Sequence, residues 1–130
     1  MRTFRVVITG HGPMAVGLLA GAQMIAGPLL DVAVVPLEAG MGTEDFDARL
    51  IAAIGPGRAL VLCDLRGGTP HNRAQVLTRR SNDSVCLAGV NMAMLLEAVL
   101  ADGDLNPALV ARIAAAGRNG IVKSAVRRPG

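Results

Sequence analysis

The stretch RVVITGHGP, residues 5–13, decides how this chain folds. Residues 5–9 form a β-branched, apolar run that ends at Gly10, which is typical of a buried strand in a parallel sheet. From Pro13 the apolar spacing becomes helical, and it stays so until the helix-stopping pair Gly27-Pro28. A buried strand that passes directly into a helix predicts the first unit of a doubly wound α/β fold.

The same alternation continues along the rest of the chain. Strands are expected at residues 32–35, 59–63 and 84–88, where short apolar runs are bounded by turn residues. Helix starts are expected at Thr43, at Thr69-Pro70 with Thr69 as the N-cap, after Asn91, and at Asn106-Pro107. The last helix should run to about Gly117. Strand–helix repeats with short connections imply a three-layer sandwich, in which helices cover both faces of a parallel sheet through right-handed crossovers.

Length and composition point to one domain over residues 1–130, because 130 residues that are 52% hydrophobic can bury a single core. No apolar stretch approaches the ~18 residues of a membrane span, and residues 1–10 lack a secretory pattern, so we expect a cytoplasmic protein. The formal charge of +3 is scattered, with two Phe and no Tyr or Trp, which disfavours a nucleic-acid binder. Cys63 and Cys86 fit buried free thiols better than a disulfide or a metal site.

Residues 119–126, NGIVKSAV, resemble a final short strand that no later segment covers. Such a strand must pair with the edge of a sheet. It could pair within its own subunit or reach across to a second copy, which would make a homodimer. The pattern of residues leaves both alternatives open.

His11 and Asp64 follow the first and third expected strands, and the carboxyl ends of parallel strands gather at one edge of the sheet. If these strands are neighbours, Asp64 can accept a hydrogen bond from one imidazole nitrogen and leave the other nitrogen as a nucleophile. An imidazole is largely neutral near physiological pH, so it can attack phosphorus without a separate base. The pair predicts a catalytic histidine that carries a phosphoryl group, with Asp64 as its support and with no metal or cofactor.

Glycine and threonine residues near this pair are candidates for holding the phosphoryl oxygens. Gly67, Gly68 and Thr69 can present backbone N–H groups and a hydroxyl, with the dipole of the following helix behind them. Gly12 can act in the same way beside His11. A strand-end His, a strand-end Asp and a Gly-Gly-Thr-Pro helix entry together indicate a functional site, which a lone histidine would not.

Four segments carry a resemblance to a known family. They are VITGHG at 7–12, DLRGGTPHN at 64–72, GVNMAML at 89–95 and GRNG at 117–120. With them the chain resembles the mannose-type enzyme IIA domains of the bacterial phosphoenolpyruvate-dependent sugar phosphotransferase system. The resemblance implies a four-stranded sheet in the order 2-1-3-4, and a phosphoryl group that passes from HPr to Nε2 of His11 and then to a IIB domain for sugar uptake. It also implies indirect service to membrane IIC and IID components, and a dimer that exchanges its C-terminal strands.

The chain departs from the common family pattern in three places. Leu65-Arg66 stands where an aromatic residue is often seen, Thr69 replaces the usual Ser, and His71 replaces the usual Phe. Thr69 keeps the hydroxyl. Arg66 and His71 are possible partner contacts, and His71 is also a candidate phosphoryl relay, although a surface residue in the first helical turn is the simpler interpretation.

Two rival functions fit the motifs less well. Residues 10–15, GHGPMA, match a loose dinucleotide fingerprint with Glu38 as a ribose ligand, but Pro13 lacks an N–H and a second half-domain is missing. Asp64 also occupies the place of the phosphoryl-accepting aspartate of receiver domains, but residues 9–11 lack the carboxylates that would hold Mg²⁺. Two further alternatives keep the family and change the role: a phosphoryl donor to a dihydroxyacetone kinase, and a regulatory module that no longer transfers.

Overall fold

A computed structural model describes residues 1–81, 83–125 and 127. Its elements are β1 (Arg5–His11), α1 (Met14–Ala26), β2 (Val32–Leu37), α2 (Thr43–Ile54), β3 (Ala59–Cys63), α3 (Thr69–Arg79), β4 (Val85–Ala88), α4 (Met92–Val99) and α5 (Pro107–Asn119). The expected alternation of strands and helices is confirmed. β1, β2 and α5 each run two residues further than the sequence predicts, and for β1 this makes His11 the last residue of the strand.

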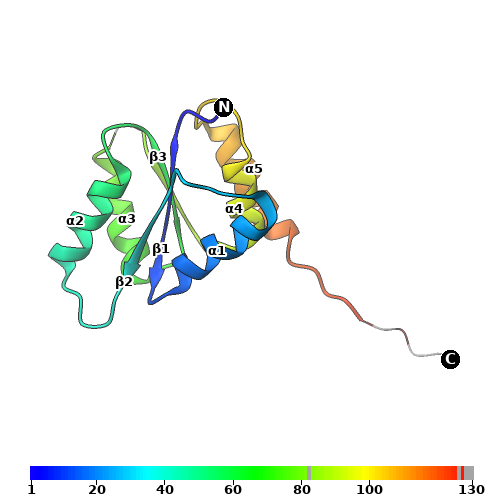
Figure 1. Cartoon of the computed structure of the whole chain (residues 1–130), viewed down its shortest axis with the longest axis horizontal. Helices are drawn as coiled ribbons and strands as arrows, with labels where there is room; N and C mark the ends of the chain where they lie inside the picture. The colour runs from blue at the N-terminus through cyan, green and yellow to red at the C-terminus, as the bar shows by residue number, and fades with distance from the viewer. Residues whose placement is uncertain (82, 126, 128–130) are drawn as a thin grey trace.

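The four strands form one parallel sheet in the order β2-β1-β3-β4, which confirms the expected fold class. Figure 1 shows α2 and α3 on one face of the sheet and α1, α4 and α5 on the other. Successive residues of a strand point to opposite faces, so the central strands serve two cores. In β3, Leu60 and Leu62 pack with α1, α4 and α5, whereas Val61 and Cys63 pack with α2 and α3.

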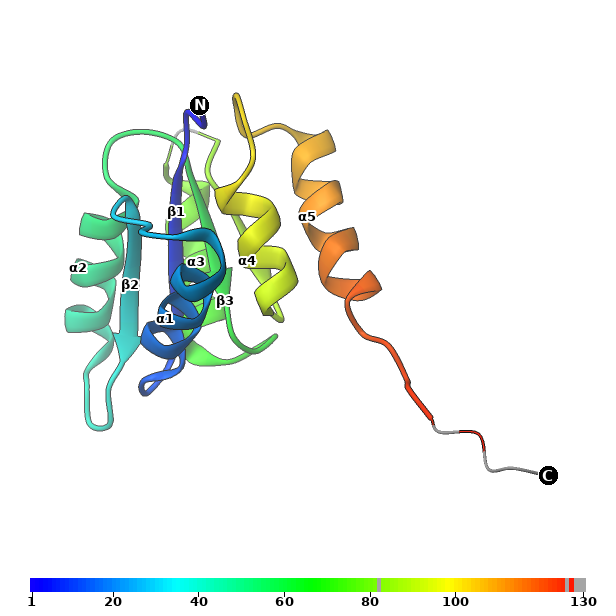
Figure 2. The ribbon, with the colours of Figure 1, turned by 45° about the vertical axis from the view of Figure 1, so that its right-hand side comes forward.

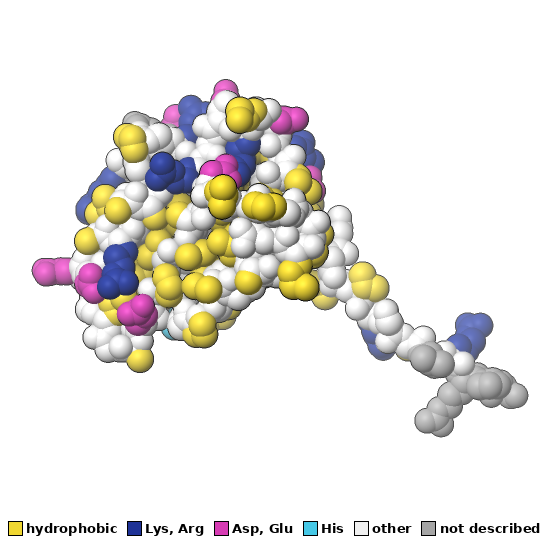
Figure 3. Space-filling view, in the orientation of Figure 1, with side chains coloured by type: hydrophobic (Ala, Val, Ile, Leu, Met, Phe, Trp, Pro, Cys, Tyr) yellow, Lys and Arg dark blue, Asp and Glu magenta, His cyan; other side chains and the backbone are white. Residues whose placement is uncertain are grey.

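Apolar and charged side chains occupy different parts of the surface. Apolar side chains spread over the middle of the face seen in Figure 1, and charged side chains lie mainly toward its margins (Figure 3). α1 crosses this face and has no charged residue along its length. In the described part of the chain, no helix is long and apolar enough to cross a membrane.

The helix starts follow the predicted pattern with one correction. The side chains of Asn91 and Asn106 accept hydrogen bonds from the third residues of α4 and α5, as N-caps do. Thr69 was expected to cap α3, and this expectation was wrong. Gly68 has the extended backbone of an N-cap, and Thr69 is already the first helical residue. The Thr69 hydroxyl therefore makes no capping bond.

The two cysteines are free thiols, as expected. Cys63 is buried in β3 and Cys86 is partly buried in β4. Burial raises the pKa of both thiols, so both are protonated at neutral pH.

The C-terminal segment leaves the body of the domain after α5 (Figures 1 and 2). Asn119, expected to start a strand, is the last residue of α5, and residues 121–125 are exposed without regular structure. Within the described residues, they pair with no strand of their own chain. Val126, the last residue of the predicted strand, lies outside the described residues. Exchange of this segment with a second copy stays a prediction.

Candidate functional site

β1 and β3 are neighbours, and this pairing brings His11 and Asp64 together. One carboxylate oxygen, Oδ2 of Asp64, accepts two hydrogen bonds from His11: one from the backbone N–H at 2.9 Å and one from Nδ1 at 2.7 Å. Because a carboxylate oxygen only accepts, the imidazole proton is on Nδ1. The other nitrogen, Nε2, then has a free lone pair, and the His11 side chain is 51% exposed.

The pKa of Asp64 favours the ionised carboxylate that accepts these two hydrogen bonds. Burial by itself would raise the pKa of this carboxyl, but the hydrogen bonds from the backbone and the imidazole of His11 outweigh burial and lower the pKa. The carboxylate is therefore ionised at neutral pH. Its side chain is only 16% exposed, so its charge acts on His11 with little screening by water.

Gly10 allows the close approach of the two strand ends, a role that the sequence interpretation missed. A Cβ atom on Gly10 would lie 3.0 Å from both Cβ and Cγ of Asp64 and 2.7 Å from Cε of Met14. The only signal in the sequence was a glycine directly before His11, which the pattern of residues explained equally well as the end of a strand.

Gly68 forms the wall behind the imidazole ring. A Cβ atom at this position would lie 3.0 Å from Cε1 of His11, the ring carbon between the two nitrogens. Gly68 is also the N-cap of α3. The positive end of that helix dipole therefore lies beside the His11 imidazole.

The backbone N–H groups of the predicted phosphoryl-binding glycines are already engaged. The N–H of Gly12 donates to the carbonyl of Leu37 at 2.8 Å, and the N–H of Gly68 donates to the carbonyl of Leu65 at 3.1 Å. The N–H of Gly67 donates to Nδ1 of His71 at 3.0 Å. The N–H groups of these glycines therefore hold the loops together and are not free to bind an anion.

Thr69 is the remaining member of the predicted set. Neither its N–H, in the first turn of α3, nor its hydroxyl makes a hydrogen bond within the described part of the chain. Unpaired N–H groups at a helix start are the usual donors to anions.

Arg66 and His71, the two possible partner contacts, differ in their surroundings. Arg66 is exposed, and it makes no ion pair within the described residues. His71 is partly buried in the first turn of α3, and its Nδ1 is taken up by the N–H of Gly67. Leu65, which with Arg66 replaces the aromatic residue often seen in the family, is 59% exposed in the same loop.

The described residues bring together no group of three His, Cys, Asp or Glu side chains that could hold a metal ion. The fold and the site define an α/β protein whose oriented, half-exposed histidine lies at the carboxyl edge of a parallel sheet. A profile of the family described as "PTS system fructose IIA component" matches residues 5–115. The chain therefore belongs to this family of phosphotransferase-system IIA components, to which the mannose-type domains also belong.

Individual relatives agree with this assignment. The chain is 31% identical to the fructose-specific EIIA component of Bacillus subtilis over 96 residues, which are 71% of this chain and 66% of that protein. It is 32% identical over 126 residues to the mannose-specific EIIAB component of Escherichia coli K12, and the match covers 92% of this chain but only 39% of that longer protein. The mannose/sorbose-specific IIA subunit of Enterococcus faecalis has the same fold, with a TM-score of 0.89, 31% identity and full coverage of both chains.

Proposed function

We propose that this chain is a phosphoryl carrier of a sugar phosphotransferase system. In this proposal, Nε2 of His11 accepts a phosphoryl group from phospho-HPr and then donates it to a IIB domain. The observation that carries the proposal is the double hydrogen bond from His11 to Oδ2 of Asp64. It keeps the proton on Nδ1 and leaves Nε2 with a free lone pair on a side chain that is 51% exposed, within a family whose members are phosphotransferase components.

The transfer needs only the two proteins and the phosphoryl group. The lone pair of Nε2 attacks phosphorus and forms a new N–P bond, while the N–P bond of the donor phosphohistidine breaks and its electron pair returns to the donor imidazole. His11 keeps its proton on Nδ1 and becomes a positively charged phosphoimidazole. The ionised carboxylate of Asp64, 2.7 Å from Nδ1, stabilises that charge. Donation to the IIB domain reverses these steps.

Thr69 is the residue that we propose to bind the phosphoryl oxygens. Its N–H and hydroxyl are unengaged in the described structure, and they lie at the start of α3, the helix that begins beside the His11 ring. The helix dipole favours negative charge at this end. Gly12, Gly67 and Gly68 then contribute by shaping the loops around the phosphoryl group.

The related proteins are named for three different sugars: fructose, sorbose and mannose. These names favour sugar uptake over service to a dihydroxyacetone kinase. In such a system, membrane IIC and IID components would receive the phosphoryl group only through the IIB domain.

The proposal is tested by incubating the chain with phosphoenolpyruvate, enzyme I and HPr, and by measuring an acid-labile phosphoryl adduct by intact mass. The adduct should form on the wild type and on His71→Ala, and it should be absent from His11→Ala. An adduct that persists in His11→Ala would overturn the assignment. Loss in His71→Ala with retention in His11→Ala would move the site to the second histidine.

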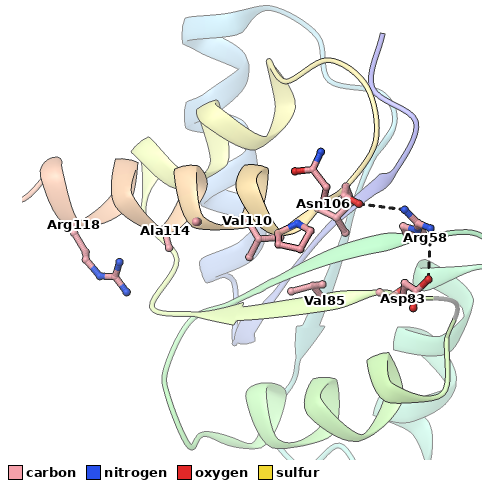
Figure 4. A pocket seen from close by; sticks show the side chains of 11 residues that line it. Arg58, Asp83, Val85, Asn106, Val110, Ala114 and Arg118 are labelled. Atoms are coloured by element: carbon pink, nitrogen blue, oxygen red, sulfur yellow. Dashed lines mark hydrogen bonds and ion pairs between the residues drawn. The ribbon is translucent and has the colours of Figure 1, made fainter.

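We also propose a homodimer in which the C-terminal segment of one copy pairs with β4 of the other. A groove of about 840 Å³ lies between β4 and α5, and neither His11 nor Asp64 lines it. Figure 4 shows Val85 of β4 on one wall and Val110 and Ala114 of α5 on the other. Ile121 and Val122, just beyond α5, are 79% and 73% exposed, and they are apolar residues of the kind that such a groove would bury.

A further inference from the structure

The second histidine has a defined protonation state. Nδ1 of His71 lies 3.0 Å from the backbone nitrogen of Gly67, and a backbone N–H can only donate. Nδ1 must therefore be the unprotonated nitrogen, which leaves the proton of the neutral ring on Nε2. The amide nitrogen of Gln75, 3.4 Å from the same Nδ1, is a second donor group on that side. The two histidines of this chain thus have opposite tautomers.

This hydrogen bond fixes the turn that forms the wall of the His11 site. Besides its bond to His71, Gly67 accepts a hydrogen bond at its carbonyl from Nδ2 of Asn72, at 3.0 Å. The N–H and the carbonyl of Gly67 are therefore both held by the first turn of α3. The next residue, Gly68, packs on Cε1 of His11. A chain of contacts runs from the His71 ring through the Gly67–Gly68 turn to the reactive imidazole.

We propose that His71 is a positioning residue that makes phosphoryl transfer depend on its own protonation. The neutral ring accepts from Gly67 and holds the turn against His11. When His71 takes up a proton, Nδ1 becomes a donor that faces the Gly67 N–H, so the hydrogen bond is lost and the turn is released. The His11 ring then loses its wall, and transfer slows. This inference rests on the proposed function of His11.

Other ionisable groups surround this turn, and the test has to separate them from His71. They are Arg66 in the preceding loop, the Asp47–Arg73 pair that joins α2 to α3 at 2.6 Å, Asp64 beside β1, and the thiols Cys63 and Cys86 of the strands behind α3. Carboxylates titrate well below neutral pH and arginine well above it, and burial raises the pKa of both thiols further. His11 is the one other imidazole in the sequence.

Two variants separate the effect of His71 from that of His11. His71→Asn places an oxygen, Oδ1, where Nδ1 stood, so it keeps an acceptor that does not titrate. His71→Phe keeps a ring of similar size but has no acceptor. In NMR spectra of the wild type, the Gly67 amide proton should move upfield as the pH falls from about 8 to 5, the range over which imidazoles titrate. The same signal should stay constant in His71→Asn.

The rate of phosphoryl transfer from phospho-HPr should follow the same pattern. At the acidic end, the wild type should lose about 2- to 10-fold more rate than His71→Asn, the factor that corresponds to one hydrogen bond. Relative to His71→Asn, His71→Phe should be slower by a similar factor at every pH, and relative to the wild type it should be slower only near pH 8, where the wild type keeps the hydrogen bond. A Gly67 amide signal that does not change with pH in the wild type, or a His71→Phe variant as fast as the wild type near pH 8, would overturn the proposal. If no variant forms an adduct while the Gly67 amide still titrates, the proposed function fails and the hydrogen bond stands.

Discussion

Asp64 does two things for His11 with one oxygen atom. Oδ2 accepts from the backbone N–H and from Nδ1, so it fixes both the strand end and the ring. The same two bonds lower the pKa of the carboxyl against the opposing effect of burial. The orientation of the imidazole, and the charge that we propose to stabilise its phosphorylated form, therefore depend on the ionised state of a single residue.

Replacing Asp64 should make the protein's stability less dependent on pH in the acidic range. The folded state prefers the ionised carboxyl, because its folded pKa is lowered. This contribution is fully present above the ordinary carboxyl range and is lost as the pH falls through the lowered pKa. Asp64→Asn should therefore be less stable than the wild type at pH 7, by about 1–2 kcal/mol, and the gap should shrink below about pH 5.

Urea unfolding of both proteins between pH 7 and 2 measures this gap. Glu97→Gln, which removes an exposed ion pair with Arg112, is the control and should change stability by less than about 1 kcal/mol. A constant difference between wild type and Asp64→Asn over the whole range would show that the carboxylate charge contributes nothing to folding.

Gly10→Ala should impair both transfer and folding. The new methyl group would meet Cβ and Cγ of Asp64, each 3.0 Å away, and pushing that carboxylate aside separates it from His11. We expect a 10- to 100-fold slower transfer, on the order of what a small misplacement of catalytic groups costs, and a loss of about 1–3 kcal/mol in stability. The measurement is single-turnover transfer from phospho-HPr.

The side chain of Met14 provides the control for this substitution, because its Cε lies 2.7 Å from the added carbon. The double variant Gly10→Ala/Met14→Ala removes that contact and leaves the one with Asp64. It should stay slow. Full recovery of the rate would mean that Met14, and not the displaced carboxylate, accounts for the defect.

The sequence could place His11 and Asp64 together because both follow strands, and the ends of parallel strands meet at one edge. It could not show where the glycine N–H groups point. That depends on which acceptor each loop offers, such as the Leu37 carbonyl for Gly12 and the His71 ring for Gly67. Neither acceptor belongs to a sequence motif, so only the structure could show which N–H groups of the site are engaged and which are free.

The helices α4 and α5 cross at Gly117, where there is no room for a larger side chain. A Cβ atom on Gly117 would lie 2.5 Å from Cγ and 2.8 Å from Sδ of Met94. The carbonyl of Gly117 also accepts a hydrogen bond from Nδ2 of Asn91, at 3.0 Å. This crossing therefore fixes the end of α5 from which the C-terminal segment departs.

Gly117→Ala should destabilise the domain by about 1–3 kcal/mol through overpacking of Met94. Gly17→Ala is the matched control, since Gly17 is also helical but a Cβ atom there meets nothing within 4 Å. It should be neutral or stabilising by up to about 1 kcal/mol, because alanine favours a helix over glycine. Chemical unfolding compares them, and equal effects of the two substitutions would argue against the tight crossing.

Element positions followed from the sequence more reliably than their ends. Asn91 and Asn106 were recognisable caps because each precedes an apolar stripe or a proline. Thr69 had the same appearance, but Gly68 takes the extended cap conformation one residue earlier. The sequence predicts that α5 ends at about Gly117, but the helix runs to Asn119. Here Gly117 is needed inside the helix for the contact with α4.

At the scale of the whole molecule, the sheet has two edges of different character. β2 contains Pro36, which lacks an N–H and interrupts the row of donors that an added strand would need. β4 contains no proline, and the groove beside it is lined by α5. A strand from a second copy therefore has an open edge to join at β4 and a blocked one at β2. This asymmetry favours an exchange that starts from the end of α5.

Deleting residues 121–130 should convert the proposed dimer into a monomer. The wild type should have a solution mass near twice the 13.3 kDa of the chain, and the deletion should give a mass near that of one chain, because the segment that would pair with β4 is gone. Removing residues 128–130 alone spares the predicted strand and should leave the dimer intact. Analytical ultracentrifugation over a range of concentrations measures all three. A monomeric wild type would rule out the dimer, and an unchanged dimer after the longer deletion would mean that another surface holds the two copies together.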